Sequence, residues 1–209
     1  HITMIKKLNY IFVVFLCALL VFSSIYVCNA SASSKSFGDS DLSSARDCVD
    51  FSVYGLQQLG YSPTYQLYGD LNLVTDVLPW INNTGNGYAF YIQIHGEENL
   101  MIDSSCNTLE PSEVGGNWDF VFLDFSDSGV NTNFANAFHT TGYSNRGFLG
   151  WDGDIYTSDA RTFGYYFWTQ HVTTASIVSA ALFATASVPG NGNAPIAYYG
   201  DNNYYGYAR

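Results

Sequence analysis

Positively charged residues are scarce in this chain of 209 residues: Lys and Arg together number seven, against 18 Asp and Glu. Two of the seven lie before Ala32 and every acidic residue lies after it, so the remainder carries a net charge near −13 (5 minus 18). Binding to a nucleic-acid backbone needs stripes of basic residues. The composition therefore argues against nucleic acid as a partner, whereas an acidic surface is compatible with a cationic or peptide ligand.

Cysteine is scarce as well, with four in the whole chain. Cys17 and Cys28 fall in an apolar segment near the N-terminus, which leaves Cys48 and Cys106. Two thiols so far apart in sequence are compatible with one disulfide or with two free thiols, and spacing does not decide between them. The same spacing offers no metal site, and we expect no cofactor.

A long apolar run occurs at the N-terminus. Lys6 and Lys7 precede the run LNYIFVVFLCALLVFSSIYV, and a segment of small residues ends at Ala32. This order is typical of a secretory signal peptide, so we expect residues 1–32 to be a leader and the protein to be secreted; the three residues before Met4 are interpreted as a remnant of cloning or gene calling. The run is also long enough to span a bilayer, so an uncleaved anchor, with membrane contact through the leader alone, is the alternative.

Cleavage after Ala32 would leave 177 residues (209 minus 32), which suits one domain with a substantial core. Residues 33–40 are rich in serine and predict a flexible lead-in. Residues 41–209 are therefore expected to form a single domain.

Short apolar runs closed by turn formers predict strands, and apolar residues at helical spacing predict helices. The predicted strands are 64–68, 88–94, 120–125, 147–151 and 194–199, with a hairpin arm at 99–103. The predicted helices are 41–60, one that begins at Asn72 and buries Trp80, 109–114, 133–139, 160–170 and 173–187. Strands that alternate with helices and are apolar on both faces are typical of a parallel sheet covered on both sides. The predicted fold class is α/β, a three-layer α/β/α sandwich with a mostly parallel sheet.

Two consecutive predicted strands end in residues that carry chemistry. The strand 88–94 is followed by His95 and a glycine, and the strand 120–125 by the sequence SDSG, which starts at Ser126. In parallel sheets the site lies beyond the carboxyl ends of the strands, so we expect these side chains, and Trp151 at the end of the next strand, to share one edge. The structural alternatives are a hydrogen-bonded strand-end histidine and a serine that satisfies a turn.

In this order the two motifs resemble the caspase-like cysteine peptidases, the family of caspases, clostripain and gingipains. In that family a strand that ends in His-Gly supplies the catalytic His, and the next ends in a motif of the form Asp-Ala-Cys-x-Ser-Gly that supplies the nucleophile. Here IHG at 94–96 is similar to the first motif and LDFSDSG at 123–129 to the second, with Asp124 in the Asp position. The order of elements from Leu56 to Tyr205, including NFANAFH and GFLGW, resembles that of secreted bacterial members. The resemblance implies a caspase-like fold and a catalytic role for the histidine position.

The sequence departs from the family at the nucleophile, because Ser126 stands where the resembled family has Cys. A thiol is a few per cent thiolate at neutral pH, whereas a Ser hydroxyl needs a base in hydrogen-bond contact and a third group to orient that base. We therefore expect a catalytically degenerate homologue, a pseudoenzyme that keeps the fold and the cleft. An active endopeptidase that uses Ser126 and His95 is the alternative. An α/β-hydrolase is disfavoured because the G-x-S-x-G elbow is missing.

Acidic residues lie in and after the strands of this edge. Asp124 sits inside an apolar strand, which is costly unless it is hydrogen-bonded and therefore favours a pocket-supporting role. In the resembled family the segment after the third strand lines the pocket for the side chain before the scissile bond, which here implies substrate-binding roles for Trp151, Asp152 and Asp154. An acidic pocket favours Arg or Lys, so the expected partner is a peptide or protein with basic residues. A solvated Asp-Gly turn is the structural alternative.

Aromatic residues are abundant, with 17 Tyr and 15 Phe. They favour a different class of function, a carbohydrate-binding or cell-surface-binding module that uses exposed rings as stacking platforms. One cluster, 165–168, is periodic enough to belong to the core. The other, 198–207, has Gly and Asn between its rings and is expected to be the more exposed.

Overall fold

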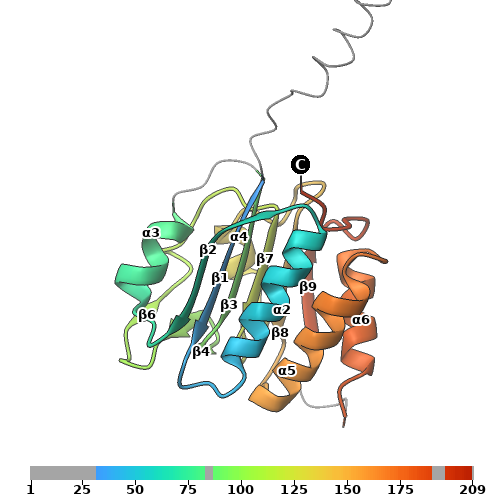
Figure 1. Ribbon diagram of the computed structural model, residues 1–209. Coiled ribbons are helices and arrows are strands. Elements are labelled where there is room, and N and C mark those ends of the chain that lie inside the picture. Colours follow the sequence, from blue (N-terminus) through green and yellow to red (C-terminus); the bar gives the residue numbers. More distant parts are fainter. Residues whose placement is uncertain (1–31, 83–86, 190–195, 209) are drawn as a thin grey trace, which may run out of the picture. The chain divides into compact units, whose positions relative to one another are not determined.

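A computed structural model of the protein describes residues 32–82, 87–189 and 196–208. Its main sheet has six strands: β1 (Ser33–Asp39), β2 (Ser62–Gly69), β3 (Tyr88–Gln93), β7 (Phe120–Asp124), β8 (Gly147–Trp151) and β9 (Ile196–Gly200). They are ordered β2-β1-β3-β7-β8-β9, and all neighbours are parallel except β9, which is antiparallel to β8 (Figure 1). The predicted fold class is confirmed: the protein is α/β, with a mostly parallel central sheet between two covering layers.

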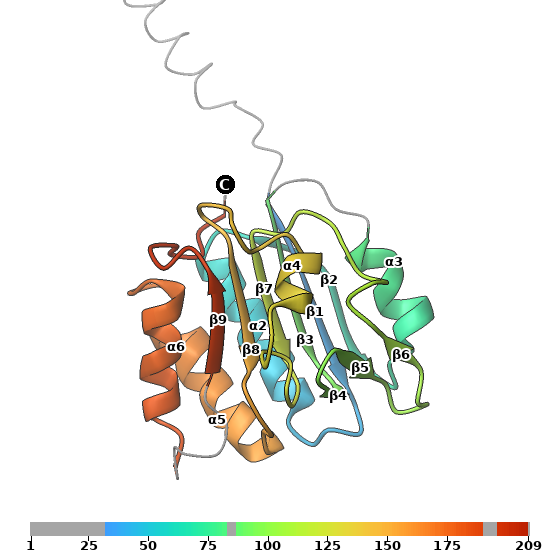
Figure 2. The same cartoon turned by 180° about the vertical axis from the view of Figure 1, so that it is seen from behind.

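Each face of this sheet has its own cover. One face packs against α2 (Ala45–Gln58), α5 (Thr157–Tyr166) with its π-helical extension η2 (Phe167–His171), and α6 (Ile177–Ala186) (Figure 1). The other face carries η1 (Leu73–Val77), α3 (Leu78–Ile81), α4 (Asn133–Ala137) and a small antiparallel sheet of β4 (His95–Glu97), β5 (Leu100–Ile102) and β6 (Thr108–Leu109) (Figure 2). Among the described residues, none of the helices combines the length and the apolar character that crossing a bilayer requires.

Strand β7 shows why these residues build a sheet that is buried on both faces. Successive side chains of a strand point to opposite faces. Phe120 and Phe122 therefore enter the core beneath α2 and α5, and Val121 and Leu123 enter the core on the other face. Asp124 falls on the same face as Phe122, which places its carboxyl group under the helices rather than in solvent.

The flexible lead-in predicted for 33–40 is wrong, because this segment contains β1, which is buried along its length between β2 and β3. Its small residues allow α2 to pack closely on the strand. Ser52 of α2 donates its hydroxyl hydrogen to Ser36 Oγ at 3.0 Å, and a Cβ added at Gly38 would lie 2.7 Å from the Val49 side chain. Serine and glycine are here the residues that fit a close helix–sheet contact. Residues 33–39 therefore belong to the folded domain.

Two further expectations differ from the structure. Residues 109–114 are not helical: Leu109 ends β6, and the chain then turns, with Glu113 N donating to Glu110 O at 3.0 Å. The helix predicted from Asn72 exists as η1 and α3, but it does not bury Trp80. The indole ring is instead exposed at the surface, where it stacks on Tyr65 of β2 with the ring centres 4.4 Å apart.

The predicted leader, including Cys17 and Cys28, lies outside the described residues except for Ala32. The signal peptide, and the alternative of an uncleaved anchor, therefore remain predictions. From Ala32 onward the chain forms one compact unit.

Candidate functional site

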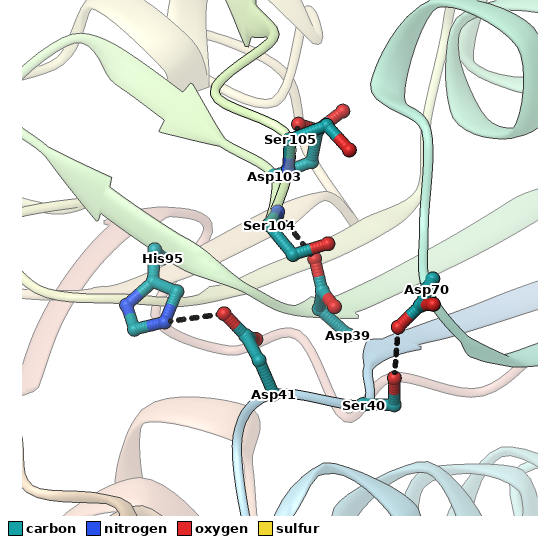
Figure 3. A network of polar contacts seen from close by, with 8 residues as sticks. All are labelled: Asp39, Ser40, Asp41, Asp70, His95, Asp103, Ser104 and Ser105. Carbon is teal, nitrogen blue, oxygen red and sulfur yellow. Dashed lines mark hydrogen bonds and ion pairs between the residues drawn. The ribbon is translucent and has the colours of Figure 1, made fainter.

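Three parallel strands, β1, β3 and β7, end at the same edge of the main sheet, and each is followed by a polar residue of the candidate site. Asp41 follows β1, His95 follows β3, and Ser126 follows β7. His95 Nε2 lies 3.0 Å from Asp41 Oδ2, and both side chains are partly exposed (Figure 3). The carboxylate of Asp41 can therefore hold the imidazole ring in one orientation.

Neighbouring polar contacts fix the loop that carries Asp41. Asp39, at the end of β1, accepts a hydrogen bond at Oδ2 from Ser104 N at 3.0 Å (Figure 3). Ser40 Oγ donates to Asp70 Oδ1 at 2.7 Å (Figure 3). These contacts tie the end of β1 to the β5–β6 turn and to the residue after β2, so the chain is anchored immediately before Asp41.

The turn after β7 is held against the segment after β8 by backbone and hydroxyl contacts. Ser128 Oγ donates to Leu123 O at 2.7 Å and accepts from Trp151 N at 2.9 Å. Gly129 N donates to Trp151 O at 2.8 Å. Ser126 Oγ accepts from Ile155 N at 3.1 Å. The SDSG sequence is therefore a structural clamp between two strands, and its first serine faces the candidate site.

A pocket of about 240 Å³ lies at this edge, and both His95 and Ser126 line it. Its other lining residues are Leu42, Gln93, Ile94, Gly96, Asp124, Phe125, Ile155, Tyr156, Thr157 and Ala160. Tyr156 is 67% exposed at the rim, whereas Asp124 is 2% exposed and forms the floor. The structure thus brings together the two predicted catalytic residues and one predicted substrate-binding residue.

The Asp124 carboxyl group is buried among neutral donors. Oδ2 accepts from Tyr91 Oη at 2.7 Å and from Gln93 Nε2 at 3.0 Å, and Oδ1 accepts from Trp151 Nε1 at 2.7 Å. Burial raises the pKa of Asp124 to about 6, and the three hydrogen bonds oppose that rise. A carboxyl group with such a pKa is ionised at neutral pH and attracts a cation that reaches the floor of the pocket.

Three of the predicted pocket assignments need correction. Trp151 is 1% exposed and belongs to the core beneath α5, and its indole N–H supports Asp124 instead of lining the pocket. Asp152 and Asp154 are exposed and do not line the pocket. They surround Asp127 instead: partial burial and the neighbouring carboxylates of Asp154, Glu98, Asp152 and Glu97 raise the pKa of Asp127. Asp152 and Asp154 therefore add acidity beside the pocket and not within it.

Two cysteines lie within the described residues, and both are free thiols. Cys48 is buried in α2, where burial raises the pKa of its thiol, and Cys106 is exposed in the turn after β5. The thiolate is the reactive form, so Cys48 is inert and Cys106 is accessible to reagents. Within the described residues no group of three or more His, Cys, Asp or Glu side chains is placed to hold a metal ion.

No protein-family model matches this chain, and no curated protein sequence matches it. The similarity to caspase-like peptidases thus stays a prediction that rests on the order and place of the motifs.

Several residues of the site carry no recognisable signal in the sequence. The serine-rich sequence of β1 predicts a flexible segment and so hides the role of Asp41, which falls just beyond the end of this strand, as His95 does beyond the end of β3. Tyr91 and Gln93 alternate with apolar residues in β3, and only the pairing of Gln93 with Asp124 across β3 and β7 reveals their role.

The alternative function, a binding module that uses exposed aromatic rings, predicts exposed rings at 198–207, and some rings are exposed in both aromatic clusters. In the cluster at 165–168, Tyr165 is exposed, whereas Phe167 and Trp168 are buried in the core. In the C-terminal cluster Tyr205 and Tyr207 are about half exposed. Single exposed rings are common on protein surfaces, so the carbohydrate-binding reading stays a prediction.

Proposed function

We propose that the protein is a secreted caspase-like peptidase homologue that binds peptides in the pocket at the sheet edge and does not turn them over efficiently. The observation that carries this proposal is the hydrogen bonding of Ser126. Its Oγ accepts a hydrogen bond from Ile155 N, and among the described residues no hydrogen bond joins it to His95. A Ser hydroxyl becomes a nucleophile when a base in contact takes its proton, and the hydrogen bond that His95 makes through Nε2 goes to Asp41 and not to Ser126.

The ligand class follows from the charge of the pocket. The walls formed by Leu42 and Ala160 are apolar, and the floor is the buried carboxyl group of Asp124. A long side chain with an apolar stem and a cationic tip matches this arrangement. The acidic residues around Asp127 add to the attraction of a basic segment.

A second candidate function has an observation in its favour. The contact between Asp41 Oδ2 and His95 Nε2 supplies the orienting group that a serine–histidine hydrolase requires. An active Ser126 endopeptidase would need His95 to approach Ser126 when a substrate binds, and hydrogen bonds of free enzymes are often longer than those of their complexes.

One experiment separates the two candidates. The purified chain is incubated with peptide libraries that carry Arg, Lys or Asp before the scissile bond, next to the variants Ser126→Ala, His95→Ala and Asp41→Asn. A homologue without efficient catalysis gives binding of basic peptides and no more cleavage than Ser126→Ala gives. Turnover that disappears in all three variants would establish the serine hydrolase and overturn the proposal.

A further inference from the structure

The floor of the pocket has few free acceptor positions. An ionised carboxylate has two oxygens and about four lone-pair positions for hydrogen bonds. Tyr91 Oη and Gln93 Nε2 occupy both positions of Asp124 Oδ2, at 2.7 and 3.0 Å. Trp151 Nε1 occupies one position of Oδ1, at 2.7 Å. One position therefore remains for a ligand, and it belongs to Oδ1.

We propose that this pocket selects lysine over arginine. The inference rests on the proposed function and deepens it by naming the side chain that the pocket takes. A guanidinium group bonds a carboxylate best as a fork, with one N–H on each oxygen, and Oδ2 of Asp124 has no position left for the second arm. An ammonium group is a point charge that needs only one acceptor on the carboxylate, and Oδ1 offers it.

Burial of the floor increases the discrimination. A guanidinium group carries five N–H donors in a fixed plane, and those that find no acceptor in a buried site lose their hydration without compensation. The ammonium group has three donors that rotate about one bond. Gln93 Oε1, which accepts one hydrogen bond from Ser44 Oγ at 3.1 Å, is a further acceptor beside Asp124. The lysine tip is therefore easier to satisfy at this floor than the arginine tip.

The test compares hexapeptides that differ at one position, which holds Lys, Arg or norleucine, for binding to the whole protein by calorimetry at pH 8. At that pH the Asp124 carboxyl group is ionised, since its pKa is about 6. We expect the Lys peptide to bind roughly fivefold or more tightly than the Arg peptide, with the norleucine peptide weakest. Equal or tighter binding of the Arg peptide would overturn the inference.

Two matched variants test the cause of the selectivity. Gln93→Met removes the donor on Oδ2 that lines the pocket, which leaves one free position on each oxygen of Asp124 and admits the Arg fork. Trp151→Phe also removes one donor but frees a second position on Oδ1, with Oδ2 still full. We expect the Lys-to-Arg affinity ratio to fall about tenfold in Gln93→Met and to stay near the wild-type ratio in Trp151→Phe.

The outcomes separate this inference from the proposed function. If no basic peptide binds the wild-type protein, the peptide-binding proposal fails, and the inference fails with it. If basic peptides bind without preference for Lys, the inference alone fails. A ratio that falls equally in both variants would show that the donors on Oδ2 do not set the selectivity. Circular dichroism checks the fold of each variant. If a variant does not fold, the comparison of the Lys and Arg peptides on the wild-type protein decides the inference.

Discussion

Asp124 is the residue on which the chemistry of the site depends. It is a carboxyl group beneath two helices, and its hydrogen-bond donors on β3 and β8 are all neutral. Hydrogen bonds from neutral groups stabilise the ionised form without cancelling its charge, which is why burial remains the larger influence on its pKa. A ligand with a cationic side chain would provide the missing charge.

The titration of Asp124 predicts a pH dependence of stability. Its pKa is about 6 in the folded chain against 3.8 for an unperturbed Asp, so the folded state binds the proton more tightly. The resulting contribution, about 3 kcal/mol, is present below pH 4 and is lost as the pH rises through 6. Urea unfolding from pH 4 to 7.5 should show this loss in the wild type and not in Asp124→Asn. Parallel pH profiles of the two proteins would contradict the assignment.

Ser126 supports a second prediction at the scale of one residue. Ser126→Cys replaces one oxygen by sulfur in the pocket that His95 also lines, so under the proposed function we expect a thiol that a lysyl chloromethyl ketone alkylates faster than an aspartyl one. Mass spectrometry locates the modified residue. The exposed thiol of Cys106 is an internal reference, and buried Cys48 should stay unmodified. A new thiol that reacts no faster than Cys106 would mean that the pocket is not a relic of catalysis.

At the scale of elements, the SDSG turn after β7 lies too close to β8 and β9 for a side chain at Gly129. A Cβ added at Gly129 would lie 2.6 Å from Ala197 Cβ and 2.9 Å from the carbonyl carbon of Gly150. The same approach permits the hydrogen bond from Gly129 N to Trp151 O. Glycine is thus required in the SDSG turn for contact between strands, and this contact holds Ser126 beside the pocket.

We expect Gly129→Ala to lower the free energy of unfolding by about 2 kcal/mol or more, because backbone atoms of β8 and a side chain of β9 must move. Gly69→Ala is the matched control, since a Cβ there meets no atom within 4 Å. Chemical denaturation of both variants gives the comparison. Equal stability of the two would show that the turn has more room than the structure indicates.

At the scale of the whole molecule, negative charge predominates. The chain carries a formal net charge of −11, and four acidic residues surround Asp127 next to the pocket. Clefts with one sign of charge attract ligands of the opposite sign, and salt screens that attraction. The approach of a basic peptide should therefore depend on ionic strength more than its departure does.

We expect the association rate of the Lys hexapeptide to fall about tenfold between 10 mM and 300 mM salt, with little change for the norleucine peptide. Stopped-flow fluorescence measures both rates. Replacing Asp152 and Asp154 together by Asn should lower the association rate at low salt. The side chains of Asp50 and Asp76 accept hydrogen bonds from Gln66 Nε2 and Asn72 N. Replacing both of them by Asn is the control, because it changes the net charge by the same amount. If both double variants lowered the association rate equally, net charge alone would cause the attraction.

The sequence by itself determined the fold class and the edge at which the candidate site lies. Apolar runs such as Phe120–Asp124 have the period and length of buried strands, and a parallel sheet places the residues after them on one edge. His95 and Ser126 could be brought together on that ground alone. This pattern is local, so it can be read without knowing which strands are neighbours.

Only the tertiary structure decided which groups meet at that edge. The contact of Asp41 with His95 joins residues 54 positions apart, and the donors to Asp124 come from strands 27 and 31 to 33 positions away. Trp151 turns inward for the same reason: the face of β8 on which it falls is set by the pairing of β8 with β7. The serines of β1 do not reveal a strand in the sequence, because their small size suits both a flexible chain and a close helix contact, and only the packing of α2 distinguishes the two.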